Sequence, residues 1–174
     1  MRKKYNLSYR EGENLNYLYL LQFIKQKNTS GNNVINQFEH TALDCAYDFD
    51  FYSANTQIKL EAKTRGIKKG FYPSYILEEL KYGNIKKLKD KHPTCLFLFA
   101  TITDDNYMLI WEIDTWKSKG YYWCPKTTAE EHNNIKEKKA CIEFYEKDAI
   151  EVIELNSDKD KLVDIVKRKT KRKF

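Results

Sequence analysis

The sequence predicts an α/β domain in which helices flank a mixed β-sheet. Residues 95–102 (CLFLFATI) are almost entirely apolar, which is typical of a strand buried on both faces in the middle of a sheet. Residues 45–52 and 57–63 alternate between apolar and polar side chains, as strands with one buried face do. Residues 13–25 instead carry apolar side chains at helical spacing. The length of 174 residues suits a single domain.

In chain order, the first expected element is the helix 13–25. Its expected inward stripe consists of Tyr17, Leu20, Leu21 and Ile24. Residues 28–33 (NTSGNN) have strong turn chemistry and predict a loop. The alternating strands 45–52 and 57–63 then form a hairpin, with the turn at residues 53–56.

A second helix is expected to begin at Pro73 and to end at His92-Pro93. The apolar residues of this segment are Ile76, Leu77, Leu80, Ile85 and Leu88. The segment forms either one continuous helix or a helix broken near Gly83. The apolar strand 95–102 follows as a central strand of the sheet. Asp104-Asp105-Asn106 predicts a turn into a further strand over residues 107–113.

The last third of the chain is less regular. It contains a short aromatic stretch at 121–124, a polar helix-like segment near 128–138 and a strand at 149–155. No repeat or Pro/Gly/Ser-rich linker separates these segments, so we expect one domain over residues 1–166. Residues 167–174 (KRKTKRKF) are expected to be a disordered basic tail.

Several classes of protein are excluded by the composition. No apolar stretch approaches the ~20 residues of a membrane-spanning helix, and no signal peptide opens the chain. The four cysteines lack zinc-like spacing, and Cys45 and Cys95 lie in apolar runs that predict core positions. We therefore expect a soluble, cytoplasmic protein without a membrane partner.

The net charge of +6 is unevenly distributed. Residues 59–91 carry ten basic and four acidic residues, whereas residues 103–166 carry nine basic and fifteen acidic residues. Residues 167–174 add six basic residues and no acidic one. A basic segment beside an acidic one can create a one-sided positive face, as nucleic-acid-binding proteins have. The alternative is that the lysines of residues 59–91 are merely solvated.

The residues that point most clearly to a chemical function lie in the strand 57–63. Its even-numbered residues are apolar and are expected to face the core, so Lys59, Glu61 and Lys63 share the opposite, open face. The Lys63 ammonium would project into the same space as the Glu61 carboxylate. A cation there could stabilise negative charge on a phosphate or orient an attacking water.

The hairpin register adds a second carboxylate to this face. With the turn centred on Ala54-Asn55, Asp48 lies directly across from Glu61, and Asp50 lies across from Lys59. Opposed residues on one face have Cβ atoms ~4.5–5.5 Å apart, and like charges there repel. An aspartate facing a glutamate therefore favours a bound cation. The oxygen ligands suit Mg²⁺, which binds one or two carboxylates together with water and substrate phosphates.

These residues resemble the motif of the PD-(D/E)XK nuclease superfamily, which includes type II restriction enzymes, archaeal Holliday-junction resolvases and phage exonucleases. Asp48 matches the family's aspartate, and Glu61-Ala62-Lys63 matches its E-x-K. Tyr47 stands where the family motif has proline. The resemblance covers residues 11–113 and implies a restriction-endonuclease-like αβββαβ core with C-terminal additions.

The E-x-K tripeptide alone is not specific. Glu79-Leu80-Lys81 and Glu137-Lys138-Lys139 fit it as well, but both lie in helix-like sequence without a facing acid. Only Glu61 lies on an alternating strand with an upstream acid at hairpin register.

The resemblance implies a metal-dependent nuclease that hydrolyses DNA phosphodiester bonds endonucleolytically, with branched DNA as a candidate substrate. Asp48 and Glu61, with the Ala62 carbonyl, would hold one Mg²⁺, for which Mn²⁺ could substitute. Lys63 would orient or activate the nucleophile. The same resemblance leaves a homodimer open.

Two carboxylates have competing interpretations. Glu13, at the head of the first helix, would supply a further catalytic carboxylate by family resemblance, with Glu11 as the alternative; either could simply favour the helix N-terminus through its dipole. Asp50 would replace Asp48 if the hairpin register slipped by two residues, but a salt bridge between Asp50 and Lys59 is the simpler interpretation.

The residues expected to contact the DNA backbone are basic and lie within or close after the hairpin. They are Lys59, Arg65, Lys68, Lys69, Lys86, Lys87 and Lys89. Such contacts position the protein without reading sequence. Tyr72 and Tyr75, near Lys68-Lys69, are candidates for base stacking.

Two alternative functions are also consistent with the sequence. The chain could be a nucleic-acid-binding module on a nuclease-like fold without catalysis, or a protein-interaction subunit whose acidic residues 103–166 meet a partner. The abundance of lysine, asparagine, isoleucine and tyrosine fits an AT-rich genome, and a small free-standing nuclease fits a phage or mobile element.

Overall fold

The structure is a computed structural model that describes residues 7, 9–30, 35–41, 46–53, 55–125 and 136–171. Its helices are α1 (Tyr9–Thr29), α2 (Glu79–Lys91) and α3 (Lys159–Lys171). Its strands are β1 (Ile35–His40), β2 (Phe49–Ser53), β3 (Thr56–Thr64), β4 (Ser74–Glu78), β5 (Leu96–Ile102), β6 (Tyr107–Glu112), β7 (Ser118–Pro125), β8 (Lys136–Tyr145) and β9 (Glu151–Glu154).

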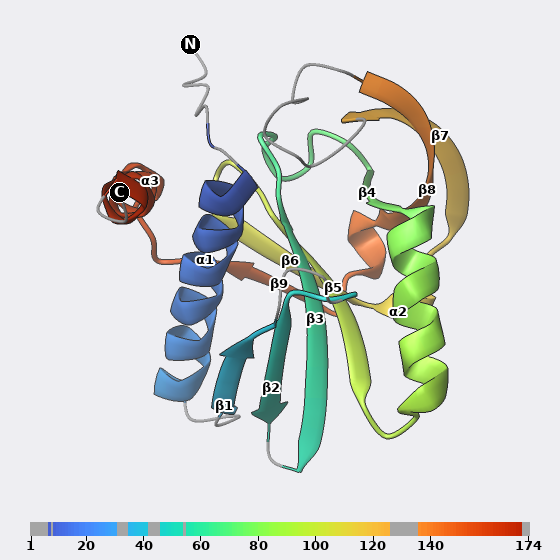
Figure 1. Cartoon of the computed structure of the whole chain (residues 1–174), viewed down its shortest axis with the longest axis horizontal. Helices are drawn as coiled ribbons and strands as arrows, with labels where there is room; N and C mark the ends of the chain where they lie inside the picture. The colour runs from blue at the N-terminus through green and yellow to red at the C-terminus, as the bar shows by residue number, and fades with distance from the viewer. Residues whose placement is uncertain are drawn as a thin grey trace.

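Two sheets build the molecule (Figure 1). The main sheet has six strands in the order β1-β2-β3-β5-β6-β9, and the second sheet has three in the order β4-β8-β7. In the main sheet only β3 and β5 run parallel, and α2 lies in the connection between them. The predicted mixed sheet flanked by helices is therefore confirmed. So is the αβββαβ order implied by the resemblance, with β4 inserted before α2.

The main sheet is covered on both faces. Helices α1 and α3 pack on one face, where Phe49, Leu60 and Ala100 are buried. Helix α2 and the second sheet pack on the other face, where Phe97 and Phe99 of β5 contact apolar residues of β4 and β8. The strand 95–102, predicted to be central, corresponds to β5 between β3 and β6. Cys95 is buried as expected, whereas Cys45 lies outside the described residues.

The β2–β3 hairpin has the predicted register. Asp50 pairs with Lys59, and Phe49 pairs with Leu60. The register is determined by the alternation, because a slip by one residue would move every apolar side chain of the hairpin to the opposite face.

The segment predicted to begin a helix at Pro73 is instead the strand β4. Tyr75 and Leu77 are buried, and β4 pairs antiparallel with β8. Helix α2 begins only at Glu79 and ends before His92-Pro93, as expected, without a break at Gly83. The pairing partner lies far along the chain, so the local spacing of apolar residues could not reveal it.

The inward face of α1 is also shifted from the prediction. Leu15, Tyr19, Leu20 and Phe23 are buried, whereas Leu21 is exposed. The helix is rich in apolar and aromatic side chains all round, so several stripes fit its sequence. The packing of α1 on β3 and β1 selects one of them.

Three further segments differ from the predictions. Strand β1 was not expected, and residues 136–138 belong to β8 instead of a polar helix; residues 126–135 lie outside the described residues. Helix α3 extends to Lys171, so the boundary expected at residue 166 falls inside a helix, and Val163 and Val166 anchor it on the core. No helix within the described part of the chain is long and apolar enough to cross a membrane.

Candidate active site

Glu61 of β3 is the centre of the candidate site. Its side chain is fully buried, and residues 58–62 are buried on both faces of the strand. Glu61 pairs with Phe99 of β5, on the face that α2 and the second sheet cover. The open face predicted for Lys59, Glu61 and Lys63 is therefore wrong, because a second layer covers much of that face.

Two lysines hold the buried carboxylate. Lys63 Nζ lies 2.9 Å from Glu61 Oε1, and Lys81 Nζ of α2 lies 3.0 Å from Glu61 Oε2. Within the described part of the chain, neither Glu61 oxygen accepts a hydrogen bond of good angular geometry. The contacts with the lysines are ion pairs, which compensate the charge of the buried carboxylate.

Burial controls the electrostatics of this group. It raises the pKa of Glu61 to about 7; the neighbouring Asp48 carboxylate adds to the rise, while Lys63 and Lys81 oppose it. For Lys63, burial alone would lower the pKa, but the carboxylates of Glu61, Asp48 and Glu13 outweigh it, and the pKa is raised. The site is a compact cluster of opposite charges in which each ion depends on its partners.

Asp48 lies beside Glu61 but not directly across from it. The regular ladder ends at the pair Phe49–Leu60, and beyond it the Asp48 amide donates to the Leu60 carbonyl at 3.0 Å. The Asp48 carboxylate accepts a hydrogen bond from the Ala62 amide at 2.8 Å. Burial raises the pKa of Asp48, Lys63 opposes the rise and Glu13 adds to it. The two carboxylates predicted to share the site are thus brought together, with a local change in register.

Glu13 lies at the start of α1 with its side chain buried. It influences the pKa values of Asp48 and Lys63, so it lies near the site as predicted. Three residues along the helix, Asn16 Nδ2 donates to the Ala62 carbonyl at 3.3 Å. Helix α1 is therefore attached to the segment of β3 that carries the predicted E-x-K.

The donor set consists of oxygen atoms, the type of ligand that hard divalent cations such as Mg²⁺ prefer. Two buried carboxylates repel one another, both oxygens of one of them lack a directed hydrogen bond, and the Ala62 carbonyl is adjacent. No group of three or more His, Cys, Asp or Glu side chains in the described residues is arranged to hold a metal ion. Glu13 thus does not complete a three-carboxylate site in this arrangement. Mg²⁺ binds readily through one or two carboxylates and water, so two suffice.

Lys81 is a residue of the candidate site that the sequence does not point to. In the sequence, Lys81 belongs to Glu79-Leu80-Lys81, a helical E-x-K tripeptide for which the local pattern supplies no facing acid. The acid is supplied by β3, because the insertion of β4 brings the first turn of α2 alongside Glu61. No local signal identifies this pair, since it joins residues twenty positions apart through the packing of a helix on a sheet.

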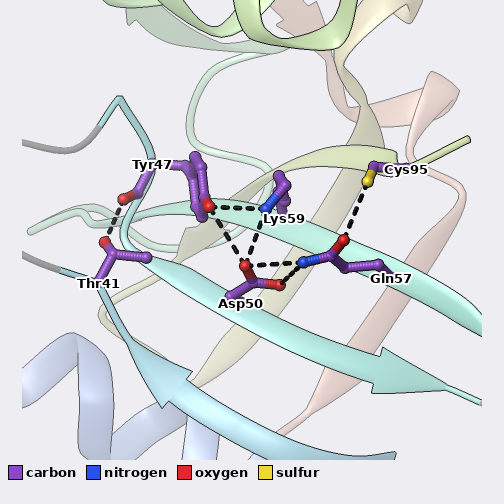
Figure 2. A network of polar contacts seen from close by, with 6 residues as sticks. All are labelled: Thr41, Tyr47, Asp50, Gln57, Lys59 and Cys95. Atoms are coloured by element: carbon purple, nitrogen blue, oxygen red, sulfur yellow. Dashed lines mark hydrogen bonds and ion pairs between the residues drawn. The ribbon is translucent and has the colours of Figure 1, made fainter. Parts of the chain in front are cut away.

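Asp50 and Lys59 form a separate network (Figure 2). Lys59 Nζ contacts Asp50 Oδ2 at 2.8 Å and the Tyr47 hydroxyl at 2.7 Å, and Gln57 Nε2 donates to both Asp50 oxygens. Lys59 is buried, and Gln57 in turn contacts Cys95. The structural interpretation of Asp50, as a salt-bridge partner of Lys59, is confirmed. Lys59 is enclosed and cannot face a DNA backbone.

The remaining basic residues predicted to contact DNA fall into three groups. Arg65 turns inward, and its guanidinium donates to the Ile76 carbonyl. Lys86 and Lys89 pair with Asp114, and Lys69 pairs with Glu146, all at partly exposed positions. Lys68 and Lys87 are exposed.

Comparisons with known proteins give a likeness to solved structures alone. No protein-family model matches the chain, and no curated protein matches it. Among solved structures the chain is similar to Hjc, a Holliday junction resolvase from Archaeoglobus fulgidus, with a TM-score of 0.49 and 10% sequence identity. The likeness covers 80% of this chain and 90% of that chain. A likeness this distant carries no argument about function. What the site can do chemically therefore has to be inferred from the residues of this chain alone.

Proposed function

We propose that the protein is a metal-dependent nuclease that hydrolyses DNA phosphodiester bonds endonucleolytically. The observation that carries the proposal is the buried Glu61 carboxylate, held between Lys63 and Lys81 with Asp48 beside it. A fold has no need of such a cluster, because burying charges costs several kcal/mol per ion before their attraction is counted. Charged groups gathered at a cost to stability are typical of catalytic sites.

Asp48 and Glu61, with the Ala62 carbonyl, would hold one Mg²⁺, and Mn²⁺ would substitute for it. The ion would act as a Lewis acid at the scissile phosphate. The Asp48 carboxylate is oriented for this role by the Ala62 amide, and the Ala62 carbonyl by Asn16.

Lys63 and Lys81 would act on opposite sides of Glu61. Lys63, which shares the strand face with Glu61, would stabilise negative charge on the phosphate and orient the attacking water. Lys81 would keep the Glu61 carboxylate in place from α2. Glu13 would contribute electrostatically from α1.

The DNA backbone would lie along the basic residues that remain accessible. Lys68 and Lys87 are exposed, and Lys69, Lys86 and Lys89 have partly exposed ion pairs that phosphates could replace. Lys59 and Arg65 are left out of this surface, because their charged groups are turned inward.

The proposal is tested by incubating the protein with supercoiled, linear and four-way-junction DNA in Mg²⁺, Mn²⁺ or EDTA. Wild type should cut in metal and not in EDTA, and Lys63→Ala should lower the rate by roughly 10²- to 10³-fold, as loss of a group that stabilises transition-state charge does. Lys147→Ala, an exposed lysine outside the proposed DNA surface, should cut like wild type. Cleavage of the supercoiled circle, which has no free ends, would establish endonucleolytic action; equal cleavage by Lys63→Ala would contradict the assignment.

A second candidate is a DNA-binding module without catalysis. It is favoured by the two ion pairs of Glu61, because two ammonium groups can compensate the buried carboxylate without a metal ion. This candidate predicts DNA binding that weakens steeply with salt and no cleavage in any divalent metal.

A further inference from the structure

The second sheet extends beyond the part of it that packs on the main sheet. Ile142 and Phe144 of β8 are buried in the second core. Strand residues two apart share a face, so Ala140 and Lys138 continue the face of Ile142. Directly opposed residues also share a face, and Trp123 of β7 pairs with Lys138. The face that forms the core at one end of the hairpin thus carries aromatic and basic residues at the other. In Figure 1, β7 and β8 arch beside β4 and α2.

The aromatic residues on the part of the β7–β8 hairpin that extends beyond the main sheet are exposed. Tyr121 is 70% exposed and Trp123 is 65% exposed, the largest values for an aromatic side chain among the described residues. Lys138 Nζ lies 5.9 Å from the centroid of the Trp123 ring. We call Tyr121, Trp123, Lys136 and Lys138 the aromatic hairpin surface. Large exposed rings in a cluster contribute little to folding and mark a binding surface.

A pocket adjoins this surface at Trp123. It has a volume of about 570 Å³, and its lining includes Arg65, Tyr72, Tyr122 and Trp123. Arg65 directly follows β3, and its guanidinium donates to the Ile76 carbonyl of β4. Tyr72, itself exposed, faces the pocket from the segment before β4.

The exposed charge of the hairpin is positive, although residues 103–166 are acidic overall. On β7 and β8 the exposed charged residues are Lys119, Lys136 and Lys138, of which Lys119 pairs with Glu79 of α2. The acids are partly buried and engaged: Glu143 accepts hydrogen bonds from the hydroxyls of Ser118 and Tyr122, and Glu137 pairs with Lys139. A surface of this charge fits a polyanion.

We propose that the aromatic hairpin surface and the adjoining pocket bind unpaired nucleotides of DNA, with bases stacked on Trp123, Tyr121 and Tyr72 and phosphates held by Lys136 and Lys138. In a duplex, both faces of each base are already stacked, so exposed rings favour single-stranded segments. The surface thus favours DNA that carries unpaired nucleotides. The inference takes DNA as partner from the proposed function but does not depend on catalysis.

The test measures binding in EDTA with a Lys63→Ala background, so that no DNA is cut. Trp111 is buried, and Trp116→Phe removes the other partly exposed tryptophan, so the fluorescence change reports Trp123. A (dT)₂₀ oligonucleotide should quench this fluorescence, and a 20-base-pair duplex should not. Trp123→Ala and Tyr121→Ala, measured by fluorescence anisotropy of labelled DNA, should each weaken single-strand binding by roughly 10- to 100-fold. Their duplex affinity should stay unchanged.

Controls separate stacking from other effects. Trp123→Phe should restore much of the single-strand affinity, because it keeps a ring. Tyr52→Ala, which removes an exposed ring from β2, should leave binding unchanged. Thermal melting should be the same for the hairpin variants and their parent, since the substituted side chains are exposed.

Two outcomes would overturn the inference. One is a single-strand affinity that stays unchanged in both alanine variants. The other is self-association that the substitutions abolish without a change in DNA binding. That result would make the surface a contact between two copies of the chain. These failures are distinct from failure of the proposed function. Wild type that never cleaves but needs Trp123 to bind (dT)₂₀ would refute the nuclease and keep the inference.

Discussion

Glu61 shows at the scale of one residue how much the site depends on its neighbours. A buried carboxylate that loses one of its compensating cations is left with an uncompensated charge, which costs about 3–5 kcal/mol for a fully buried pair. Lys63 and Lys81 are each only partly buried, at 32% and 28% side-chain exposure, so water compensates part of either loss. Loss of either lysine should thus cost less stability than loss of a fully buried partner.

Lys81→Ala should therefore impair catalysis more than folding. Glu61 loses one of its two ion pairs, so we expect the cleavage rate to fall by roughly 10- to 100-fold and the Mg²⁺ concentration for half-maximal rate to rise, as when a metal-ligand support is removed. Lys91→Ala, an exposed position on the same helix, is the matched control. Lys81→Arg should recover part of the activity. A rate and metal dependence identical to wild type would remove Lys81 from the site.

Glu143 gives a pH dependence that is independent of the metal site. Hydrogen bonds from the Ser118 and Tyr122 hydroxyls lower the pKa of Glu143 below its usual 4.5. A group whose pKa is depressed by folding stabilises the fold above the unfolded value, and this stabilisation is lost as the pH falls through the folded value. Glu143→Gln should thus lower the urea midpoint by a constant amount between pH 7 and pH 5. Below pH 4.5 the difference from wild type should shrink; a difference that grows in acid would contradict the assignment.

At the scale of the element, β4 is where the local pattern and the structure disagree. Ile76, Leu77 and Leu80 were assigned to one helix, but Leu77 is buried in a strand and Leu80 is 78% exposed in the first turn of α2. The strand exists because β8 supplies its hydrogen-bonding partners.

This difference is measurable with two alanine variants. Leu77→Ala should destabilise the protein by about 2–5 kcal/mol, because it leaves a cavity in the second core. Leu80→Ala should change the stability by less than about 0.5 kcal/mol, as exposed substitutions do. Urea denaturation monitored by circular dichroism measures both. Equal losses would favour the helical stripe over the strand.

At the scale of the whole molecule, the site lies where several layers meet. Glu61 and Lys63 come from the main sheet, Lys81 from α2, Glu13 from α1, and Asp48 from the bend before β2. An ion bound there would connect segments that are separate in the chain, so it should stabilise the fold as a unit.

Mg²⁺ or Mn²⁺ should accordingly raise the melting temperature. At a metal concentration 100 times the dissociation constant the stabilisation is about 2.7 kcal/mol, which for a chain of this length corresponds to roughly 5–10 °C. Glu61→Gln should abolish the rise, whereas Asp50→Asn, in the neighbouring network, should keep it. Differential scanning fluorimetry with EDTA as reference measures the shift. A rise that persists in Glu61→Gln would place the metal elsewhere.

The sequence by itself determined the features that depend on short-range alternation. The β2–β3 hairpin and its register at Asp50–Lys59 follow from side chains that alternate with a period of two, and the central strand β5 follows from a nearly continuous apolar run. The association of Asp48, Glu61 and Lys63 follows from the same register, with a local adjustment at Asp48 where the ladder ends.

Only the tertiary structure decided what covers that hairpin. The burial of Glu61, the strand β4, the phase of α1 and the approach of Lys81 all result from contacts between segments distant in the chain. A periodic pattern defines which side chains share a face but not what packs against it, because the partner contributes the hydrogen bonds and the apolar surface. For this reason the strand face that was predicted to be open is buried. The ion pair between Lys81 and Glu61 forms because the helix that carries Lys81 is part of the layer that buries this face.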